Sequence, residues 1–269
     1  MILIHLTPWD LTLASVLVLL LAAMSWRLRL GVERRILIAA TRSAVQLMLV
    51  GFVLKFLFAQ TSLPLIALMM LVMLSAAGFE VMQRQKRRYR GLWGYGIGAF
   101  SMFLSSFTVT LLALTVIIGV EPWYQPQYLI PLLGMLLGNA MSGVAIALDS
   151  LTRQAWESRG KIEARLLAGG TWEESIEDIR RESLRAGLIP IVNAMGTAGL
   201  VSLPGMMTGQ ILAGSPPLEA AKYQLLIMFL ISAGTGLGSV AAVWLGSRRL
   251  FDDRQRLRLD RLAEADGRH

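Results

Sequence analysis

The sequence predicts an all-α, polytopic integral membrane protein of about seven membrane-spanning helices, and two observations support this fold class. Of the 269 residues, 55% are hydrophobic and only 16% are charged, whereas soluble domains are about 25% charged. The apolar residues fall in blocks of roughly 20, the length that a helix needs to cross a ~30 Å hydrocarbon core. The chain has no cysteine, and its two histidines, His5 and His269, lie at opposite ends. Metal sites built on histidine or thiolate within one chain are therefore excluded.

The expected spans are residues 11–26, 36–58, 63–82, 94–119, 128–148, 188–212 and 223–246. The first is short, but neither a basic segment nor a small-residue cleavage site accompanies it, so we expect it to remain as a signal anchor. Tryptophan and tyrosine residues lie near the ends of most stretches, where a membrane interface favours them. The sixth stretch contains Pro190, Pro204 and four glycines, which predict a broken or re-entrant helix.

The basic residues predict the orientation in the membrane. Of the 26 Lys and Arg residues, 23 lie in four segments. These segments are the loop after the first span, the loop after the third span, residues 150–187 and the residues after Ser247. These four segments alternate with connections that hold almost no basic residue. Because cytoplasmic loops carry the excess of Lys and Arg, we expect the N-terminus outside and the C-terminus inside, in a multi-pass protein of the cytoplasmic (inner) membrane. Residues 247–269 then form a basic cytoplasmic tail.

Residues 150–187 are too polar to cross the membrane and predict a cytoplasmic amphipathic helical hairpin between spans 5 and 6. Gly169 and Gly170 separate its two helices, and the second opens with a capping box of Thr171 and Glu174. The hairpin could lie on the membrane surface or dock a cytosolic partner. Its faces carry charges of both signs, whereas lipid-surface helices are uniformly basic, so we favour docking. The whole chain, residues 1–269, is expected to form a single transmembrane permease domain, in which residues 150–187 are a cytoplasmic coupling insertion.

The chain encodes no nucleotide-binding motif of its own. None of its four lysines stands in the Gly-x-x-x-x-Gly-Lys-Ser/Thr frame that holds nucleotide phosphates. We therefore expect a protein that is not an enzyme, and any ATP must be hydrolysed by another subunit. The spans also lack carboxylates near their centres, although proton-coupled carriers usually keep such a group.

Small and neutral polar residues are the candidates for packing and for a substrate path. Glycines at four-residue spacing predict close helix contacts, with a dimer interface or substrate path as the alternative; they are Gly134, Gly138, Gly234 and Gly238. Neutral polar side chains and methionine thioethers could tie helices together or bind a soft cation. Together with the Pro204-Gly205 break, the candidates for a substrate pathway are Asn139, Met141, Asn193, Ser202, Pro204, Gly205, Met206, Met207 and Thr208.

Three expectations follow for particular residues. Gly170 is expected to adopt a left-handed turn that valine would bar. Asn139 is expected to make an interhelical hydrogen bond beside a close contact at Gly138 and Gly134. Pro204 is expected to leave carbonyls of residues 197–203 without helical partners, so that the segment is either a gate or a packed kink.

Four stretches resemble the Fet-type permeases of bacterial iron-export ABC transporters, which are related to plant aluminium-tolerance half-transporters. They are residues 138–141, 180–190, 199–209 and 222–224. The resemblance implies a homodimer of permeases paired with two cytosolic ABC ATPase subunits that exports metal. ATP and magnesium would then bind the ATPase, and this chain would bind no cofactor and no nucleic acid.

Residues 166–171 resemble the glycine-centred coupling turn of that family, with Gly170 in place of its usual alanine. The resemblance thus places ATPase coupling at Leu167, Gly169, Gly170, Thr171, Trp172 and Ile176. Ser215 stands where family members often have an aspartate, so an acid that attracts cations is not expected there. Two alternatives stay open: an ABC permease for an organic solute, and a non-transporting scaffold that recruits a cytosolic protein.

Overall fold

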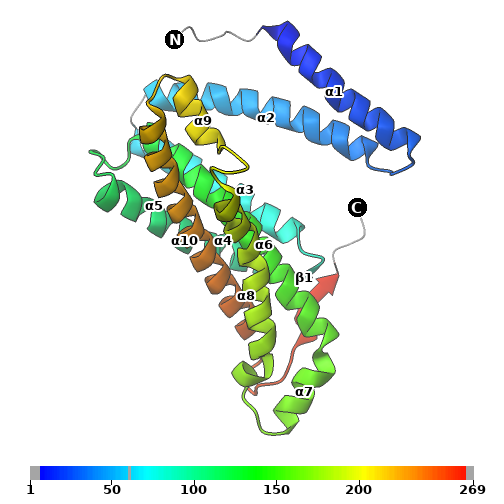
Figure 1. The fold of residues 1–269 in the computed structure, drawn as a ribbon. Helices are drawn as coiled ribbons and strands as arrows, with labels where there is room; N and C mark the ends of the chain where they lie inside the picture. Colours follow the sequence, from blue (N-terminus) through cyan, green and yellow to red (C-terminus); the bar gives the residue numbers. More distant parts are fainter. Residues whose placement is uncertain (1–6, 60–61, 265–269) are drawn as a thin grey trace. The chain divides into compact units, whose positions relative to one another are not determined.

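The computed structural model describes residues 7–59 and 62–264 (Figure 1). Both histidines, residues 60–61 of the second connection and residues 265–269 of the basic tail lie outside this part. The described chain is dominated by helices, as the composition predicted. It divides into two compact units, one of residues 1–62 with 212–214 and one of the remaining residues.

The first unit contains α1 (Pro8–Arg27) and α2 (Glu33–Ala59), which pack against each other. The turn between them contains two left-handed residues, Arg29 at φ 53° and Gly31 at φ 69°. These reverse the chain within five residues. Ser25 near the end of α1 donates a hydrogen bond to Glu33 at 3.3 Å, which ties the two helix ends together.

The second unit begins with α3 (Leu63–Gln83), the short strand β1 (Arg87–Tyr89) and α4 (Leu92–Met102). The helix that starts as α4 continues to Ile117 through two π-helical segments, Phe103–Phe107 and Ala113–Ile117, with α5 (Thr108–Leu112) between them. Next come the long α6 (Pro126–Glu157), α7 (Arg159–Leu167), α8 (Trp172–Thr197) and α9 (Gly205–Leu212). The chain ends with α10 (Pro217–Arg249), a 3₁₀ turn (Leu259–Arg261) and the strand β2 (Leu262–Glu264).

Helix α6 is the centre of the second unit. It packs against α10, α8 and α3, and α4 packs against both α3 and α10. The buried residues form two apolar clusters, one around Leu148 and Val243 and the other around Leu136 and Ile227. Because α6 contributes to both clusters, it links the two halves of this core.

Six helices of the described residues are long and apolar enough to cross a membrane. They correspond to the first five expected spans and the seventh. The expected span at residues 188–212 is instead split, because α8 ends at Thr197 and α9 is only eight residues long. Gly199, at φ 82°, and Pro204 lie in the non-helical residues between them. The break that the prolines and glycines predicted is therefore present, whereas seven spans and their orientation remain predictions.

A small antiparallel sheet was not expected in an all-α protein. Strand β1 pairs with β2, and Tyr89 lies opposite Leu262. Tyr89 is buried and donates a hydrogen bond from its hydroxyl to the Gly246 carbonyl of α10 at 2.8 Å; burial raises the pKa of Tyr89. Residues 250–264 of the basic tail thus fold back against the helices.

Candidate functional site

The turn between α7 and α8 is held by hydrogen bonds at both helix ends. At the end of α7, the Gly170 N–H donates to the Arg165 carbonyl at 3.1 Å and the Gly169 N–H donates to Leu166 at 3.0 Å. This pair of bonds is a Schellman motif, which requires a left-handed residue just after the helix. At the start of α8, Thr171 and Glu174 form the predicted capping box, since each side chain accepts the other's N–H. The bond from the Thr171 N–H lowers the pKa of Glu174.

The left-handed residue of this turn is Gly169, at φ 90°, and not Gly170 as expected. The expectation took the second glycine as the turning point, but α7 ends one residue earlier. Gly170 is constrained differently: a Cβ there would lie 3.0 Å from the Arg165 carbonyl oxygen. Both glycines are therefore needed, the first for its backbone conformation and the second for a close approach.

Gly169→Ala is expected to loosen the turn, because a left-handed conformation costs a residue with a Cβ about 1–2 kcal/mol. The expected result is faster amide hydrogen exchange at residues 168–171, with exchange in α6 and α10 unchanged. Gly160→Ala in α7 is the matched control, since a Cβ there meets nothing within 4 Å. Equal exchange in the two variants would contradict the Schellman assignment.

The six expected coupling residues divide into an exposed group and a buried group. Leu167 is 88% exposed, whereas Ile176 is fully buried. The Trp172 ring is partly buried and lies 5.6 Å from the Phe251 ring, centroid to centroid. Leu167, Gly169 and Thr171 can therefore touch a partner, while Trp172 and Ile176 anchor the turn to the core.

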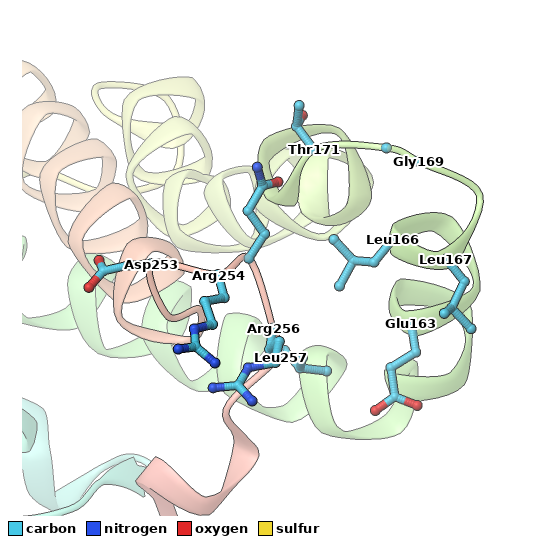
Figure 2. Close-up of a pocket in the computed structure, with 11 residues that line it drawn as sticks. Glu163, Leu166, Leu167, Gly169, Thr171, Asp253, Arg254, Arg256 and Leu257 are labelled. Atoms are coloured by element: carbon cyan, nitrogen blue, oxygen red, sulfur yellow. The ribbon is translucent and has the colours of Figure 1, made fainter.

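The C-terminal segment forms the other wall of a groove beside this turn. Figure 2 shows the groove, 740 Å³ in volume, between residues 163–171 and residues 253–257. Gln255 reaches across and accepts a hydrogen bond from the Trp172 N–H at 3.0 Å. Asp252 shapes the segment by accepting the N–H groups of Arg254 and Arg256 at 3.0 and 2.9 Å.

The sequence analysis treated residues 247–269 only as a basic tail and missed this contribution. The local signal was Asp252, because an aspartate followed by donors two and four residues later is typical of a capped turn. Its position beside α8 depends on non-local pairing of β1 with β2, which composition does not reveal.

An ion pair joins the two helices of the hairpin. Arg165 in α7 lies 2.6 Å from Asp178 in α8, and Lys161 lies 3.5 Å from the same carboxylate. The Arg165 guanidinium lowers the pKa of Asp178. The Lys161 and Asp178 side chains are largely exposed and that of Arg165 is 38% exposed, so the ion pair orients α7 more than it stabilises the protein.

The expected packing glycines do not behave alike. A Cβ on Gly234 would lie 3.1 Å from Leu136, and one on Gly238 would lie 2.8 Å from Ser105. A Cβ on Gly134 would lie 3.2 Å from the Met73 methyl carbon. A Cβ on Gly138 would meet nothing within 4 Å in the described chain, so the close contact expected there is not made within one chain.

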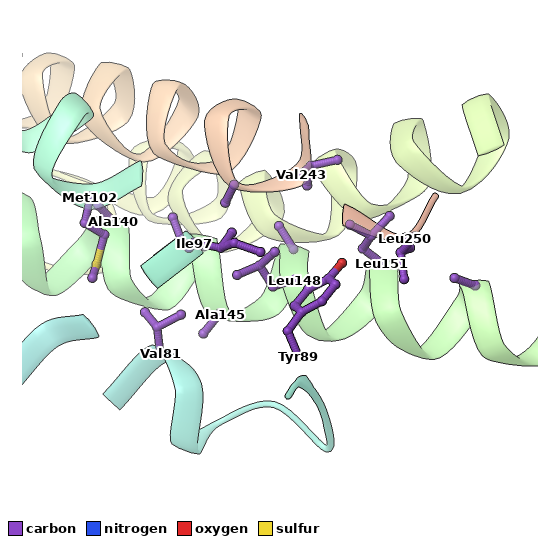
Figure 3. Packing of buried hydrophobic residues seen from close by; sticks show 14 of the residues in the cluster. Val81, Tyr89, Ile97, Met102, Ala140, Ala145, Leu148, Leu151, Val243 and Leu250 are labelled. Atoms are coloured by element: carbon purple, nitrogen blue, oxygen red, sulfur yellow. The ribbon is translucent and has the colours of Figure 1, made fainter. Parts of the chain in front are cut away.

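Helices α6 and α8 approach each other closely at two glycines that the sequence analysis did not select. A Cβ on Gly187 of α8 would lie 2.7 Å from the Gly143 carbonyl oxygen of α6, and one on Gly143 would lie 2.5 Å from Thr235 of α10. Figure 3 shows the neighbouring buried cluster, in which Ala140, Ala145 and Leu148 of α6 lie beneath α10. Three helices thus meet at Gly143 and Gly187.

The expected pathway residues on α6 and α8 do not share one surface. Asn139 is exposed and donates its amide hydrogen bond to Met135 of its own helix at 2.8 Å. The expected interhelical bond is therefore not made within the described chain. Met141 packs against the buried cluster instead, and Asn193 is exposed on α8.

The break between α8 and α9 keeps some of its carbonyls bonded. The Thr197 carbonyl accepts the Val201 N–H at 3.0 Å, and the Ser202 carbonyl accepts the Gly199 N–H at 2.9 Å. The expected loss of a helical partner is thus wrong at Thr197, whose carbonyl keeps a bond from the residue four positions later, whereas the Ser202 carbonyl accepts a loop N–H in place of a helical one. Thr208 donates its hydroxyl to Pro204 at 3.2 Å.

The remaining break residues present a mixed surface. Ser202 and Gly205 are exposed, Met207 is half-buried, and Met206 packs against the buried cluster of Leu136. Within residues 7–59 and 62–264, no three His, Cys, Asp or Glu side chains converge. A cation held at this break would have to use hydroxyl, thioether or carbonyl ligands.

Comparisons with known proteins place the chain in one family. Residues 8–251 match the Uncharacterised protein family (UPF0014). The chain is 38% identical over 240 residues to the UPF0014 membrane protein slr1647 of Synechocystis sp., covering 88% of this chain and 90% of that protein. No solved structure matches the chain significantly.

Two further relatives agree with the resemblance noted from the motifs. The Probable iron export permease protein FetB of Escherichia coli is 32% identical over 253 residues, covering 94% of this chain and 95% of FetB. Protein ALUMINUM SENSITIVE 3 of Arabidopsis thaliana is 33% identical over 232 residues, covering 86% of this chain and 83% of that protein. The chain therefore belongs to the UPF0014 family of membrane proteins, and its relatives include the probable iron export permease FetB and the plant protein ALUMINUM SENSITIVE 3.

Proposed function

We propose that this chain is the membrane-spanning permease subunit of an ATP-driven ABC exporter that moves metal, with iron as the substrate, out of the cytoplasm. The similarity to FetB over 94% of the chain carries the proposal. The absence of a phosphate-binding lysine motif from the sequence supports a separate ATPase subunit, which would hold ATP and magnesium. The assembly would contain two permeases and two ATPases in the cytoplasmic membrane.

The α7–α8 turn is the proposed contact with the ATPase. It combines an exposed leucine, Leu167, with a backbone fixed at both ends by the Schellman motif and the capping box. A fixed turn transmits a displacement of its partner into α8, whereas a loose loop would absorb it. Leu167, Gly169, Gly170 and Thr171 would form the contact surface, and Trp172 and Ile176 would connect it to the core.

The break between α8 and α9 is the proposed part of the substrate path that holds the metal. It offers the Ser202 hydroxyl and the thioethers of Met206 and Met207, which would bind a borderline cation such as Fe²⁺ only weakly and so suit a site from which the cation is released. Asn139, Met141, Asn193 and Thr208 are assigned to the remainder of the path.

Co-expression with candidate ABC ATPase subunits tests the proposed function. The permease should copurify with one of them, and the reconstituted complex should hydrolyse ATP faster when iron is added. Stimulation by organic solutes but not by metals would favour the alternative substrate class. A complex that forms without substrate-dependent hydrolysis or efflux would favour a scaffold.

Met206→Ala, Met207→Ala and Ser202→Ala are each expected to raise the iron concentration that half-stimulates the ATPase about fivefold, the effect of losing ~1 kcal/mol of binding. Leu200→Ala is the control, because Leu200 lies in the same loop, is 89% exposed and offers no ligand atom. Unchanged metal dependence in all three variants, with Pro204→Ala also active, would leave the break as only a bend.

A further inference from the structure

A basic pocket lies where α4 begins and α10 ends. These helices pack side by side (Figure 1). One candidate membrane span begins at Leu92 and another ends at Arg249, and Trp93 lines the same pocket as Arg249. The pocket has a volume of 420 Å³, and its wall includes Arg248, Arg249 and Arg261. Three guanidinium groups are thus gathered at the level where two helices leave the membrane.

Two tryptophans stack with these arginines. The Arg249 guanidinium carbon lies 4.4 Å from the Trp93 ring centroid, and that of Arg248 lies 5.9 Å from the Trp244 ring centroid. Both rings line the pocket. Tryptophan prefers the headgroup layer of a bilayer, so the stacks place the arginines at the same depth as lipid phosphates.

The arginines of the pocket have guanidinium N–H groups that are not used in ion pairs. None of the three has a carboxylate within 4 Å in the described part of the chain, where the ion pairs of the tail involve Arg256 and Arg258 instead. Among the residues that the structure describes, no hydrogen-bond acceptor faces the buried Nε of Arg249. Arg261 uses one nitrogen for the carbonyls of Arg249 and Phe251 at 2.8 and 3.1 Å. Buried donors without acceptors are costly, so the pocket suits an anion with several oxygens.

Two aspartates also line the pocket but do not neutralise it. Asp252 lies 2.8 Å from Arg256 and accepts backbone N–H groups, so its charge is already matched by residues outside the pocket. Asp253 is exposed. Three arginines against one unmatched aspartate leave the pocket positively charged.

An apolar groove of 280 Å³ adjoins the pocket and shares Trp93 and Leu245 with it. It continues along α4 past Gly96 to Phe100, one turn after another into the span. A free phosphate would use only the basic pocket, whereas an amphiphile with an anionic head and an apolar tail would fill both. We propose that this site binds an anionic phospholipid, with its phosphate on the three arginines and one acyl chain in the groove.

Native mass spectrometry of the full chain in detergent, titrated with dioleoyl-phosphatidylglycerol and with dioleoyl-phosphatidylcholine, tests the proposal. The wild-type chain should bind the anionic lipid more tightly. Because each arginine near an anionic headgroup contributes about a fivefold preference, Arg248→Gln should lose about fivefold and the pair Arg248→Gln with Arg249→Gln about 25-fold. Arg248 is exposed, so the single variant should fold even if the pair does not.

Two further variants separate this site from general charge and from a free-anion site. Arg180→Gln with Arg181→Gln removes the same charge from α8 and should leave lipid binding unchanged. Gly96→Leu should place a side chain in the groove, since a Cβ there meets no atom of the described chain within 4 Å, and should weaken phosphatidylglycerol binding at least fivefold. Equal losses in the two arginine pairs would overturn the proposal. It would equally fail if Gly96→Leu bound lipid normally while millimolar inorganic phosphate displaced it.

Discussion

Gly187→Ala is expected to destabilise the protein, although alanine normally stabilises a helix relative to glycine by about 1 kcal/mol. The added Cβ would lie 2.7 Å from the Gly143 carbonyl oxygen and 2.9 Å from the Ala147 Cβ. The oxygen belongs to the backbone of α6 and cannot rotate away, so α8 must shift. Overpacking of this kind costs about 1–3 kcal/mol, which is a large share of a total stability of about 5–15 kcal/mol.

The measurement is the temperature at which half of the detergent-solubilised protein remains monodisperse. Gly196→Ala is the matched control in the same helix, because a Cβ there meets nothing within 4 Å. The two substitutions are chemically identical and should shift this temperature in opposite directions, down for Gly187 and level or up for Gly196. A Gly187→Ala protein as stable as the wild type would mean that α6 and α8 do not cross here.

Leu167→Arg is expected to weaken binding to the ATPase about 30-fold while leaving the fold intact. Leu167 is 88% exposed at the end of α7, so its replacement removes no core contact. A central apolar anchor of an interface is worth about 2 kcal/mol or more, and its loss corresponds to a decrease in affinity of about 30-fold. The affinity would be measured with the purified ATPase subunit and the full permease in nanodiscs.

Leu167→Met provides the control, since it keeps an apolar side chain of similar volume and should retain binding. If Leu167→Arg bound the ATPase normally, the turn would not be the docking site, but binding by the wild-type chain would still support the permease assignment. If no ATPase bound the wild-type chain, the proposed function itself would fail.

Hydropathy predicted most of the long helices because a membrane span is a local property of about 20 residues. The bounds of α2, α3 and α10 lie within several residues of the expected spans. The sixth stretch was harder, because its apolar residues 188–197 continue an amphipathic helix that begins at Trp172. Hydropathy therefore predicts the start of a span at residue 188, although the helix is continuous there.

The parts of the site that depend on residues close together in the sequence could be predicted. The capping box of Thr171 and Glu174 needs only a spacing of three residues, and it is present. Deciding which of the adjacent glycines, Gly169 or Gly170, is left-handed requires knowing the last residue of α7. A shift of one residue in that helix end exchanges the two assignments. Gln255 and the crossing at Gly143 and Gly187 depend on residues more than 40 positions apart, and one sequence carries no sign of such pairings.

Helix α8 is a single rod from the α7–α8 turn to the break at residue 198, and the Gly143–Gly187 crossing divides it into two arms. At ~1.5 Å per residue, the arm from Trp172 to Gly187 is about 22 Å long and the arm from Gly187 to Thr197 about 15 Å. If α8 rotates as a rigid body about this crossing, its two ends move in opposite directions. The displacement of the longer end exceeds that of the shorter end by a ratio of about three to two. A push on the turn would therefore move the break in the opposite direction, through a smaller arc and with a larger force.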